Sequence, residues 1–482
     1  MLRFFHRPLP GRLFVLLLVL VAVRVPLWAL GGSPLTLAEF RQQLLGGRLG
    51  SGDLALYRGL FTTEAPLSAY LWQAPDLLGG GRSGVVYRGV AAALLLTQGL
   101  YFNYLLHRRG ALAERSWLPL LLYGLVGAVW WELDALSPLL WGQTFMLLAF
   151  GNLTATSREG YDNRTLFQGG FLLGLAGLCY PPLLLFGLVG LLSIVFFAAN
   201  AFRSSLLLLV GILFPYAALG TAYFYLGSLA GFIAQHLTLS TMWPFQPVAL
   251  IPAALTWRVL AGPAVLLVVA GLRTLERGGQ LNYQVRFRQV MLAWLGVAVV
   301  IVAAGSTFTP AAALLPFLPP LAYFAPALLG HGARAWLNEV LFGCAVGALL
   351  AVRYAAPLGL AARLPTVPAA LRATVAPGQP DPARGVRDAR LLILGEPDWR
   401  AYAANRPASP YFDWVLARPD FEQLATYGAL YRLHQHFRTA PPTVLLDSGR
   451  RYVPTLRARL PSSFAAYREV RPGVWQRSST NQ

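Results

Sequence analysis

Residues 13–30 read LFVLLLVLVAVRVPLWAL, an almost unbroken apolar run that follows three arginines within the first twelve residues. A run of this length can cross the hydrocarbon core of a bilayer as a helix. The charged start is similar to that of a secretory signal peptide, but no small-residue cleavage site follows, and Arg24 and Pro26 interrupt the outer end of the run. We therefore expect the run to remain in the protein as a membrane anchor.

The rest of the chain repeats this pattern. Of its 482 residues, 56% are hydrophobic and only 12% are charged, which is the composition of a multi-pass membrane protein. We predict about eleven transmembrane helices, near 13–30, 89–106, 117–131, 138–152, 167–180, 182–199, 205–226, 259–272, 290–305, 311–329 and 337–355.

The formal charge of +19 comes from arginine alone, because the chain contains no lysine. No basic patch is interleaved with aromatic residues on a soluble segment, so we expect no nucleic-acid partner. If the N-terminus is cytoplasmic, arginines fill the inner connections, while the outer connections after the third, fifth, seventh and ninth spans contain none. The opening loop and the C-terminal tail are long basic exceptions, and both then face the periplasm.

The composition changes near residue 365, where a linker rich in proline, glycine and arginine begins. We predict a transmembrane domain at 1–364 that includes an outer loop at 31–88, a linker at 365–388 and a small soluble periplasmic domain at 389–482. In that domain we expect strands at ARLLILG, PTVLLD and GVWQR, with helices over 411–437 and 452–467. The predicted fold class is an all-α polytopic membrane bundle with a small C-terminal α/β domain.

Two further features limit the chemistry. The tail has no Gly-rich nucleotide-binding motif after its first strand, only LGEPD, so nucleotide binding there is not expected. Cys179 and Cys344 both lie in apolar runs, which excludes a disulfide framework or a cysteine metal cluster.

Three stretches together resemble the GT-C glycosyltransferases, which include protein O-mannosyltransferases and bacterial aminoarabinose transferases. They are the opening loop with LTLAEF and GSGDLALY, the segment WWELDALSPLLWGQTFMLLAFG, and the tail segment RLLILGEPDWRAYAANRPASPYFDW. The resemblance implies transfer of a sugar from a polyprenyl-phosphate-linked donor to a lipid, glycan or protein at the periplasmic face of a bacterial inner membrane. It implies membrane lipids as surroundings, and it leaves a divalent metal open as a cofactor.

Such a reaction needs a base for the acceptor hydroxyl, and acids at the rim of the lipid phase suit that role. The candidates are Glu39, Asp53, Glu132 and Asp134. Each also has a structural explanation. Glu39 with Thr36 forms a capping-box pattern, Asp53 suits a turn, and the other two suit a short solvated connection.

The departing lipid phosphate needs cations, and Arg58, Arg88 and Arg258 lie at outer positions where a guanidinium can pair with phosphate oxygens. Snorkelling to lipid headgroups explains the same positions. Tyr57 ends the GSGDLALY segment, and His236 lies in an apolar outer loop. We include both as candidate substrate-binding residues, although an interface role also explains His236.

Two alternatives remain open. GT-C members usually carry an Asp-Glu pair where this chain has Ala38-Glu39, and this difference keeps open a non-catalytic scaffold or subunit of an envelope complex derived from the same fold. The prolines crowded at 311–329 fit the cavity of a transferase and also that of a transporter or flippase. A transporter, however, should show inverted repeats and ionisable residues near the midplane of the bilayer, and we find neither.

Overall fold

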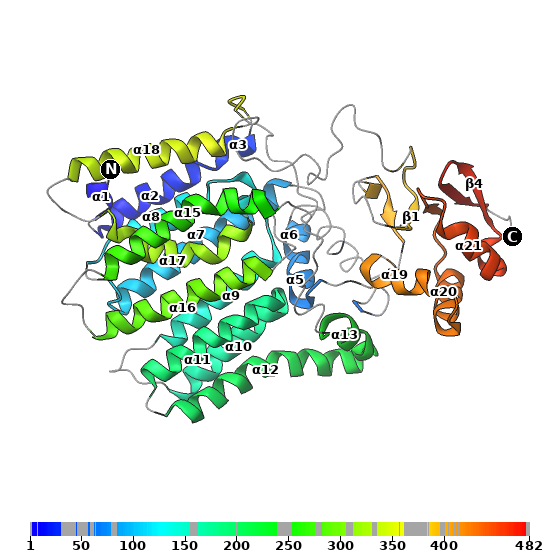
Figure 1. Cartoon of the computed structure of the whole chain (residues 1–482), viewed down its shortest axis with the longest axis horizontal. Helices are drawn as coiled ribbons and strands as arrows, with labels where there is room; N and C mark the ends of the chain where they lie inside the picture. Colours follow the sequence, from blue (N-terminus) through cyan, green and yellow to red (C-terminus); the bar gives the residue numbers. More distant parts are fainter. Residues whose placement is uncertain are drawn as a thin grey trace. The chain divides into compact units, whose positions relative to one another are not determined.

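The protein is described by a computed structural model, in which the chain divides into two compact units (Figure 1). The helical unit comprises Met1–Pro34, Leu78–Leu219 and Met242–Pro368, and the loop-and-tail unit comprises Leu35–Leu77, Gly220–Thr241 and Ala369–Gln482. The structure describes residues 2–6, 8–29, 45, 56–57, 62, 64–78, 84–112, 114–154, 162–198, 200–238, 253–275, 282–304, 312–329, 335–355, 357–360, 383, 385–395, 401–402, 404–408, 411 and 414–478.

Within these residues, helical segments occupy all eleven predicted apolar runs. They are α2 Pro10–Ala22 with α3 Val25–Ala29, α7 Gly84–Arg108, α8 Leu118–Val126, α9 Pro138–Leu153, α10 Asn163–Cys179, η2 Pro181–Leu185 with α11 Phe186–Phe197, α12 Ala201–Tyr225, α15 Ala253–Leu275, α16 Asn282–Ala304, η3 Ala312–Phe317 with α17 Leu318–Phe324 and η4 Ala325–Ala327, and α18 Ala335–Arg353. The short helix α1 Leu2–His6 precedes them, and η1 Trp131–Asp134 follows α8. The prediction of a mostly helical unit is confirmed, whereas the prediction that all eleven runs cross a membrane stays a prediction.

Five of the described helices are long and apolar enough to cross a membrane. They are Pro10–Trp28, Val85–Arg108, Ala201–Tyr225, Tyr283–Val302 and Trp336–Arg353, and shorter apolar helices lie at Pro181–Phe197, Ala261–Leu272 and Ala313–Ala327. The chain is a multi-pass membrane protein. Its outer helices expose large apolar side chains, such as Phe202 and Leu213 on α12, as a surface facing lipid requires.

Glycines allow α10 and α12 to approach closely. A Cβ atom on Gly170 would lie 2.2 Å from the carbonyl oxygen of Leu208, and one on Gly211 would lie 2.5 Å from that of Phe167. Neither backbone oxygen can move aside, so a side chain at either position would push the two helices apart. Small residues at such contacts are typical of helices that pack in membranes.

The proline-rich segment 312–327 is broken into short helical turns, as its composition predicts. Pro319 and Pro320 have no N–H groups, so the carbonyls of Leu315 and Pro316 lose their usual helical donors. The side chains of Gln143 and Trp294 replace them, with Gln143 Nε2 2.9 Å from the Leu315 oxygen and Trp294 Nε1 2.9 Å from the Pro316 oxygen. Neighbouring helices therefore satisfy the backbone that proline disrupts.

The tail folds into a five-stranded mixed sheet in the order β2-β1-β3-β5-β4. Its strands are β1 Arg390–Ile393, β2 Arg406–Pro407, β3 Val444–Leu446, β4 Tyr467–Arg471 and β5 Val474–Arg477. The helices are α19 Trp414–Glu422, α20 Tyr427–Thr439, α21 Tyr452–Arg459 and α22 Pro461–Phe464. β2, β1 and β3 are parallel, whereas β5 pairs antiparallel with β3 and β4.

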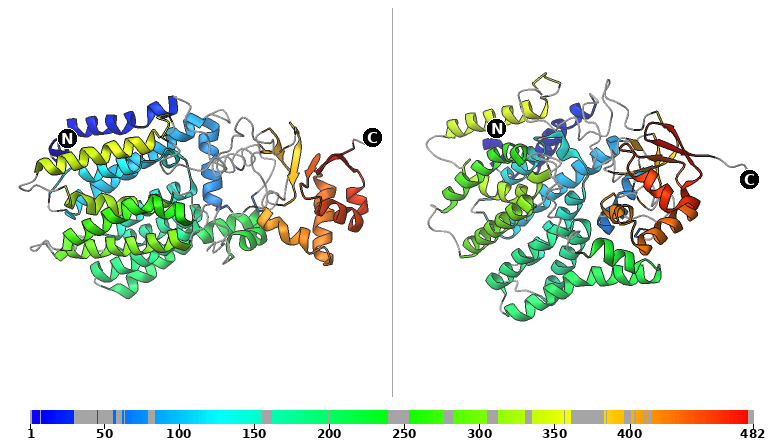
Figure 2. Two further views of the ribbon diagram at one scale, coloured as in Figure 1. Left: turned by 45° about the horizontal axis from the view of Figure 1, so that its top comes forward. Right: turned by 45° about the vertical axis from the view of Figure 1, so that its right-hand side comes forward.

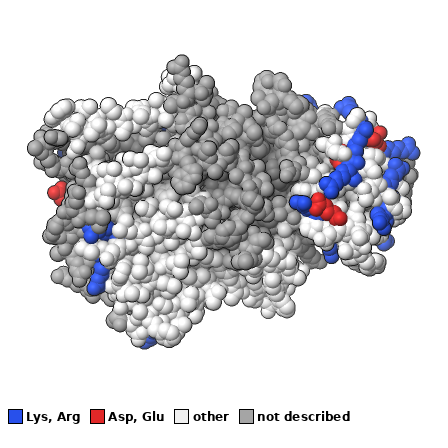
Figure 3. Space-filling model, in the orientation of Figure 1, with Lys and Arg blue, Asp and Glu red and all other residues white. Residues whose placement is uncertain are grey.

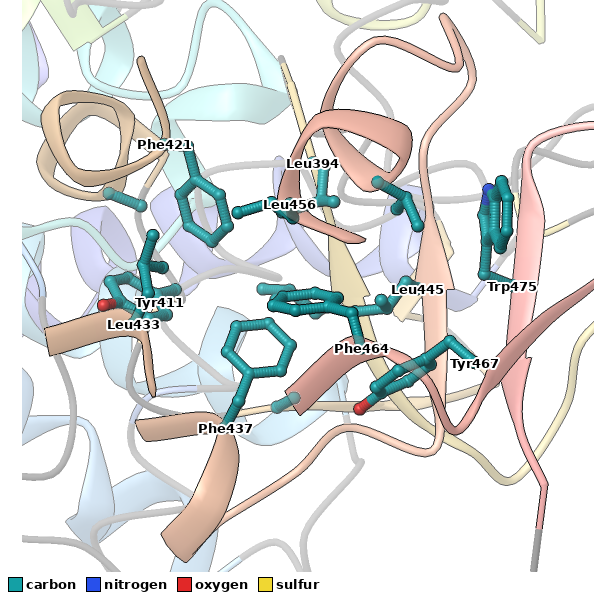
Figure 4. Packing of buried hydrophobic residues seen from close by; sticks show 14 of the residues in the cluster. Leu394, Tyr411, Phe421, Leu433, Phe437, Leu445, Leu456, Phe464, Tyr467 and Trp475 are labelled. Atoms are coloured by element: carbon teal, nitrogen blue, oxygen red, sulfur yellow. The ribbon is translucent and has the colours of Figure 1, made fainter. Parts of the chain in front are cut away.

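Alternate side chains of the strands enter two apolar clusters. Leu392 and Leu445 join one cluster with Phe437 and Phe464 (Figure 4), while Leu391 joins the other. The three strands predicted from the sequence are confirmed. Two predictions for the helices need correction, because residues 423–426 separate α19 from α20, and the segment predicted as one helix over 452–467 forms α21 and the short α22.

The loop part of the loop-and-tail unit contains α5 Pro66–Leu71 and α13 Leu229–His236, and α6 Gln73–Leu78 ends at its boundary. Two further views of the elements are given in Figure 2. The domain boundaries proposed from the sequence, at 364 and 388, stay predictions.

Candidate functional site

Asp134 ends η1, in the short connection that follows α8, and its side chain is completely buried. Its Oδ1 accepts a hydrogen bond from Arg24 Nε at 3.0 Å. Its Oδ2 accepts hydrogen bonds from Arg353 Nη2 at 2.5 Å and from Trp28 Nε1 at 3.1 Å. We call these four residues the Asp134 cluster. It joins one carboxylate to two guanidinium groups that are themselves at most 2% exposed.

Arg24 lies where the first span breaks between α2 and α3. Its Nη2 donates to the carbonyl of Gly127 at 3.1 Å and to that of Gly124 at 3.4 Å, and its Nη1 donates to Leu20 at 3.4 Å. These oxygens belong to the last turns of α8 and α2, where carbonyls lack helical partners. The guanidinium therefore serves both as the counter-ion of Asp134 and as a cap for two helix ends.

Arg353 performs the same two tasks from the end of α18. Its Nε donates to the carbonyl of Val23 at 2.9 Å, and its Nη1 donates to that of Ala128 at 2.7 Å. The hydroxyl of the next residue, Tyr354, also donates to the Val23 oxygen at 2.9 Å. The Asp134 cluster therefore holds the C-terminal ends of three helical segments, α2–α3, α8 and α18, at one end of the helical unit.

This geometry suits Asp134 to holding helices in place. Both carboxylate oxygens accept charged or polar donors, and no part of the side chain reaches the surface. A general base must come within hydrogen-bond distance of the hydroxyl that it deprotonates. The catalytic role predicted for Asp134 therefore stays a prediction, and the structure gives the residue a role in stability that the sequence did not reveal.

Arg24 and Arg353 were not among the predicted site residues. The sequence did contain an indication of their importance, because both lie in apolar runs, where a charged residue is costly and is usually paired or functional. What the sequence lacked was the partner, since Arg24 and Arg353 lie 110 and 219 residues from Asp134.

The structure brings together two predicted binding residues, Tyr57 and His236, in the loop-and-tail unit. The Tyr57 ring lies 5.5 Å from that of Tyr223, 5.7 Å from that of Phe232 and 6.4 Å from that of His236. Its hydroxyl donates to the carbonyl of Glu64 at 2.9 Å. We call Tyr57, Tyr223, Phe232 and His236 the aromatic cluster.

The backbone at Tyr57 is unusual for a bulky residue, with φ at 65°. Its carbonyl oxygen lies so near α13 that a Cβ atom on Gly231 would be 2.1 Å away. A second contact, from the Thr62 backbone N–H to Gln235 Oε1 at 3.3 Å, ties the same loop to α13. The aromatic cluster thus fastens the opening loop to the segment that follows α12.

His236 is fully buried and stacks on Phe232 at a centroid distance of 5.4 Å. Burial lowers the pKa of the ring to about 4, so His236 is neutral at pH 7. A base this weak is poorly matched to proton abstraction at neutral pH. Substrate binding by Tyr57 and His236 stays a prediction.

The other predicted residues are described less fully. Arg88 is buried on α7, one turn from its first residue. Arg258 belongs to α15 and Glu132 to η1, but their side chains lie outside the described part of the chain, as do Glu39, Asp53 and Arg58 entirely. Among the described residues no group of three His, Cys, Asp or Glu side chains could hold a metal ion, so no described ligand set supports the divalent metal.

Comparison with known proteins gives little further information. No family model matches the chain. No curated protein matches it. Among solved structures, the crystal structure of the Archaeoglobus fulgidus oligosaccharyltransferase in the apo form is similar, at 12% sequence identity and a TM-score of 0.44 over 70% of this chain. The chain spans 55% of the length of that protein.

Proposed function

We propose that the protein is a membrane glycosyltransferase that moves a sugar from a polyprenyl-phosphate-linked donor to a lipid, glycan or protein acceptor. The observation that carries this proposal is the Asp134 cluster. It holds together the C-terminal ends of α3 and α18, which are the last described helices of the helical unit before the opening loop and before the tail. The resemblance to GT-C enzymes implies this arrangement, with loop and tail on the face where transfer occurs.

In this proposal Glu39 takes the proton from the acceptor hydroxyl. The acceptor oxygen bonds to the anomeric carbon of the sugar as the bond from that carbon to the phosphate oxygen breaks. Negative charge then grows on the departing lipid phosphate, and Arg58, Arg88 and Arg258 are the proposed cations that stabilise it. Asp53, Glu132 and Asp134 are the other candidates for the base, and the burial of Asp134 makes it poorly accessible to an acceptor.

The orientation is also a proposal, supported by arginines at the other end of the helical unit. There Arg109 Nη2 donates to the carbonyl of Gly151 at 3.1 Å, and Arg286 Nη1 donates to that of Phe196 at 2.6 Å. Arginine-rich connections are typical of the cytoplasmic side, and this supports the proposal that the Asp134 cluster and the tail face the periplasm of a bacterium. A cysteine at Ser448 should react with a membrane-impermeant reagent added from the periplasmic side, and protection until lysis would reverse the orientation.

The activity test is the substitution Glu39→Gln. Glutamine keeps the volume and most hydrogen bonds but cannot accept the proton, so transfer of radiolabelled sugar from polyprenyl-phosphate donors should fall by about 10²-fold or more. The matched control is Glu114→Gln, at an exposed acid beyond the C-terminal end of α7, which should leave transfer unchanged. Unchanged thermal stability in both variants would separate lost chemistry from lost folding, and full activity of Glu39→Gln would remove Glu39 from the site.

A second candidate function is a non-catalytic scaffold of an envelope complex. The observation that favours it is the burial of Asp134, Tyr57 and His236, each held in contacts within the protein. A scaffold should show no transfer in the wild type across a broad panel of donors. Transfer that depends on Glu39 would exclude this alternative.

A further inference from the structure

The helix α20 carries two exposed tyrosines. Tyr427 is 81% exposed and Tyr431 is 54% exposed, and their rings stack one helical turn apart with centroids at 6.2 Å and planes at 21°. The opposite side of the helix, including Leu433 and Phe437, is buried in the core of the tail (Figure 4). The fold therefore needs α20 for packing, but it does not need aromatic rings on the outer side.

Two arginines and a glutamine are exposed on the same helix as these rings. Arg432, Gln435 and Arg438 are also exposed on α20, and the helix contains no acidic residue. Arg432 donates to Asp420 Oδ1 from Nη2 at 2.6 Å, yet more than half of its side chain remains exposed. We call Tyr427, Tyr431, Arg432, Gln435 and Arg438 the α20 face.

The charge of the tail is consistent with an anionic partner. Residues 389–482 contain thirteen arginines and seven acids. On the surface drawn in Figure 3, charged side chains gather on the tail, while the described surface of the helical unit shows few. Large aromatic rings with arginine beside them are common where a protein meets the headgroups of a bilayer.

We propose that the α20 face binds the anionic phospholipid headgroups of the membrane in which the chain is embedded. The tyrosine rings enter the interfacial layer, and Arg432 and Arg438 bind headgroup phosphates. Residues 354–389 connect α18 to β1, and this connection is short enough to keep the tail within reach of the bilayer surface and to make binding effectively intramolecular. This inference does not depend on the proposed transferase activity.

Phosphate lipids fit the α20 face better than a glycan does. Aromatic rings stack on sugars as well as on headgroups, but sugar hydroxyls are also bound by carboxylates. The helix α20 has none, and the carboxylate of Asp420 beside it is buried and already accepts from Arg432. Two exposed arginines instead match an anion. Each arginine at an anionic surface strengthens binding by about fivefold.

The test uses the full chain in nanodiscs, with Cys344→Ser as background and a fluorescent label on Gln435→Cys. Headgroup nitroxide lipids should quench this label strongly in discs of phosphatidylcholine with phosphatidylglycerol, and much less in phosphatidylcholine alone or in high salt. The matched control label is Val470→Cys, on the exposed strand β4, which should be quenched equally weakly in all discs. The variants Arg438→Gln and Tyr427→Ser with Tyr431→Ser should each reduce quenching at position 435 by about fivefold or more.

Two results would overturn the proposal. One is equal quenching of the labels at 435 and 470 in neutral and anionic discs. The other is quenching at 435 that ignores lipid charge but is relieved by free oligosaccharide, which would identify the α20 face as a sugar-binding surface. Because all the substituted residues are exposed, unchanged thermal unfolding should confirm that every variant is folded.

Discussion

The helical unit and the tail both contain ion pairs between arginine and an acid, in very different surroundings. In the Asp134 cluster, the side chains of Arg24, Asp134 and Arg353 are at most 1% exposed. In the tail, the pairs Arg418–Glu422 and Arg450–Glu469 are made by side chains that are 28–62% exposed. The distances are similar, between 2.5 and 3.0 Å.

The comparison shows that distance does not measure the importance of an ion pair. Water and salt can replace either partner of an exposed pair at little cost. The side chains of the Asp134 cluster are shielded from bulk solvent, so removing one partner leaves the others charged and buried. The guanidinium groups of the buried pairs also donate to carbonyls at helix ends. Four predictions test this difference, in order of decreasing effect.

The largest effect is expected for Asp134→Asn. The amide has nearly the same shape but leaves two buried guanidinium groups without a counter-charge, so the protein should lose about 3–5 kcal/mol of stability. Thermal unfolding in detergent, followed by tryptophan fluorescence, measures the loss. The double variant Asp134→Asn with Arg353→Met removes one uncompensated charge and should recover part of the stability. An unfolding midpoint for Asp134→Asn equal to that of the wild type would contradict the structural role of the cluster.

Lowering the pH can also create a buried charge, by protonating the His236 ring. His236 has its pKa lowered to about 4, so the unfolded chain binds this proton more readily than the folded chain does. The stability that neutral His236 contributes is therefore fully present above pH 6.5 and is lost as the pH falls toward 4. Between pH 7 and pH 5 the free energy of unfolding should fall by about 2 kcal/mol. The variant His236→Phe keeps the ring stacking and should show a pH dependence weaker by that amount. The same pH dependence in both proteins would mean that His236 is not buried in solution.

Asp447 is a buried acid whose partners are backbone groups. Its oxygens accept from the N–H groups of Arg451 at 3.1 Å and of Tyr452 and Val453 at 2.8 Å, at the start of α21. We expect Asp447→Ala to cost about 1–2 kcal/mol, seen as faster proteolysis of the tail in the full chain. Thr426→Ala is the control, because Thr426 precedes α20 but its side chain makes no cap bond. Equal effects of the two substitutions would refute the cap.

The smallest effect is expected for Glu422→Gln, which breaks the exposed pair with Arg418 one turn away on α19. The free energy of unfolding should differ from that of the wild type by less than about 0.5 kcal/mol, and added salt should reduce even that difference. The same detergent assay serves for this variant and for Asp134→Asn. If Glu422→Gln proved as costly as Asp134→Asn, burial would not explain the difference between the two regions.

Elements with a strong local signal were the easiest to predict. The eleven helical runs and the strands β1, β3 and β5 were found from apolar composition alone. Strand β4 was missed because it is an edge strand, and only Tyr467 of its five residues is buried, so its sequence YREVR shows no alternation. Strand β2 has only two residues, Arg406 and Pro407, too few for any pattern.

The candidate site was harder to predict than the fold. The sequence alone determined that this protein enters a membrane and where its helices lie, because insertion depends on the composition of about 20 consecutive residues. It also singled out Asp134 as an unusual acid. Only the tertiary structure decided that Asp134 pairs with Arg24 and Arg353, and that Tyr57 meets His236. The reason is physical, because an ion pair or ring contact between distant residues depends on which helices pack together, and local composition does not specify that packing.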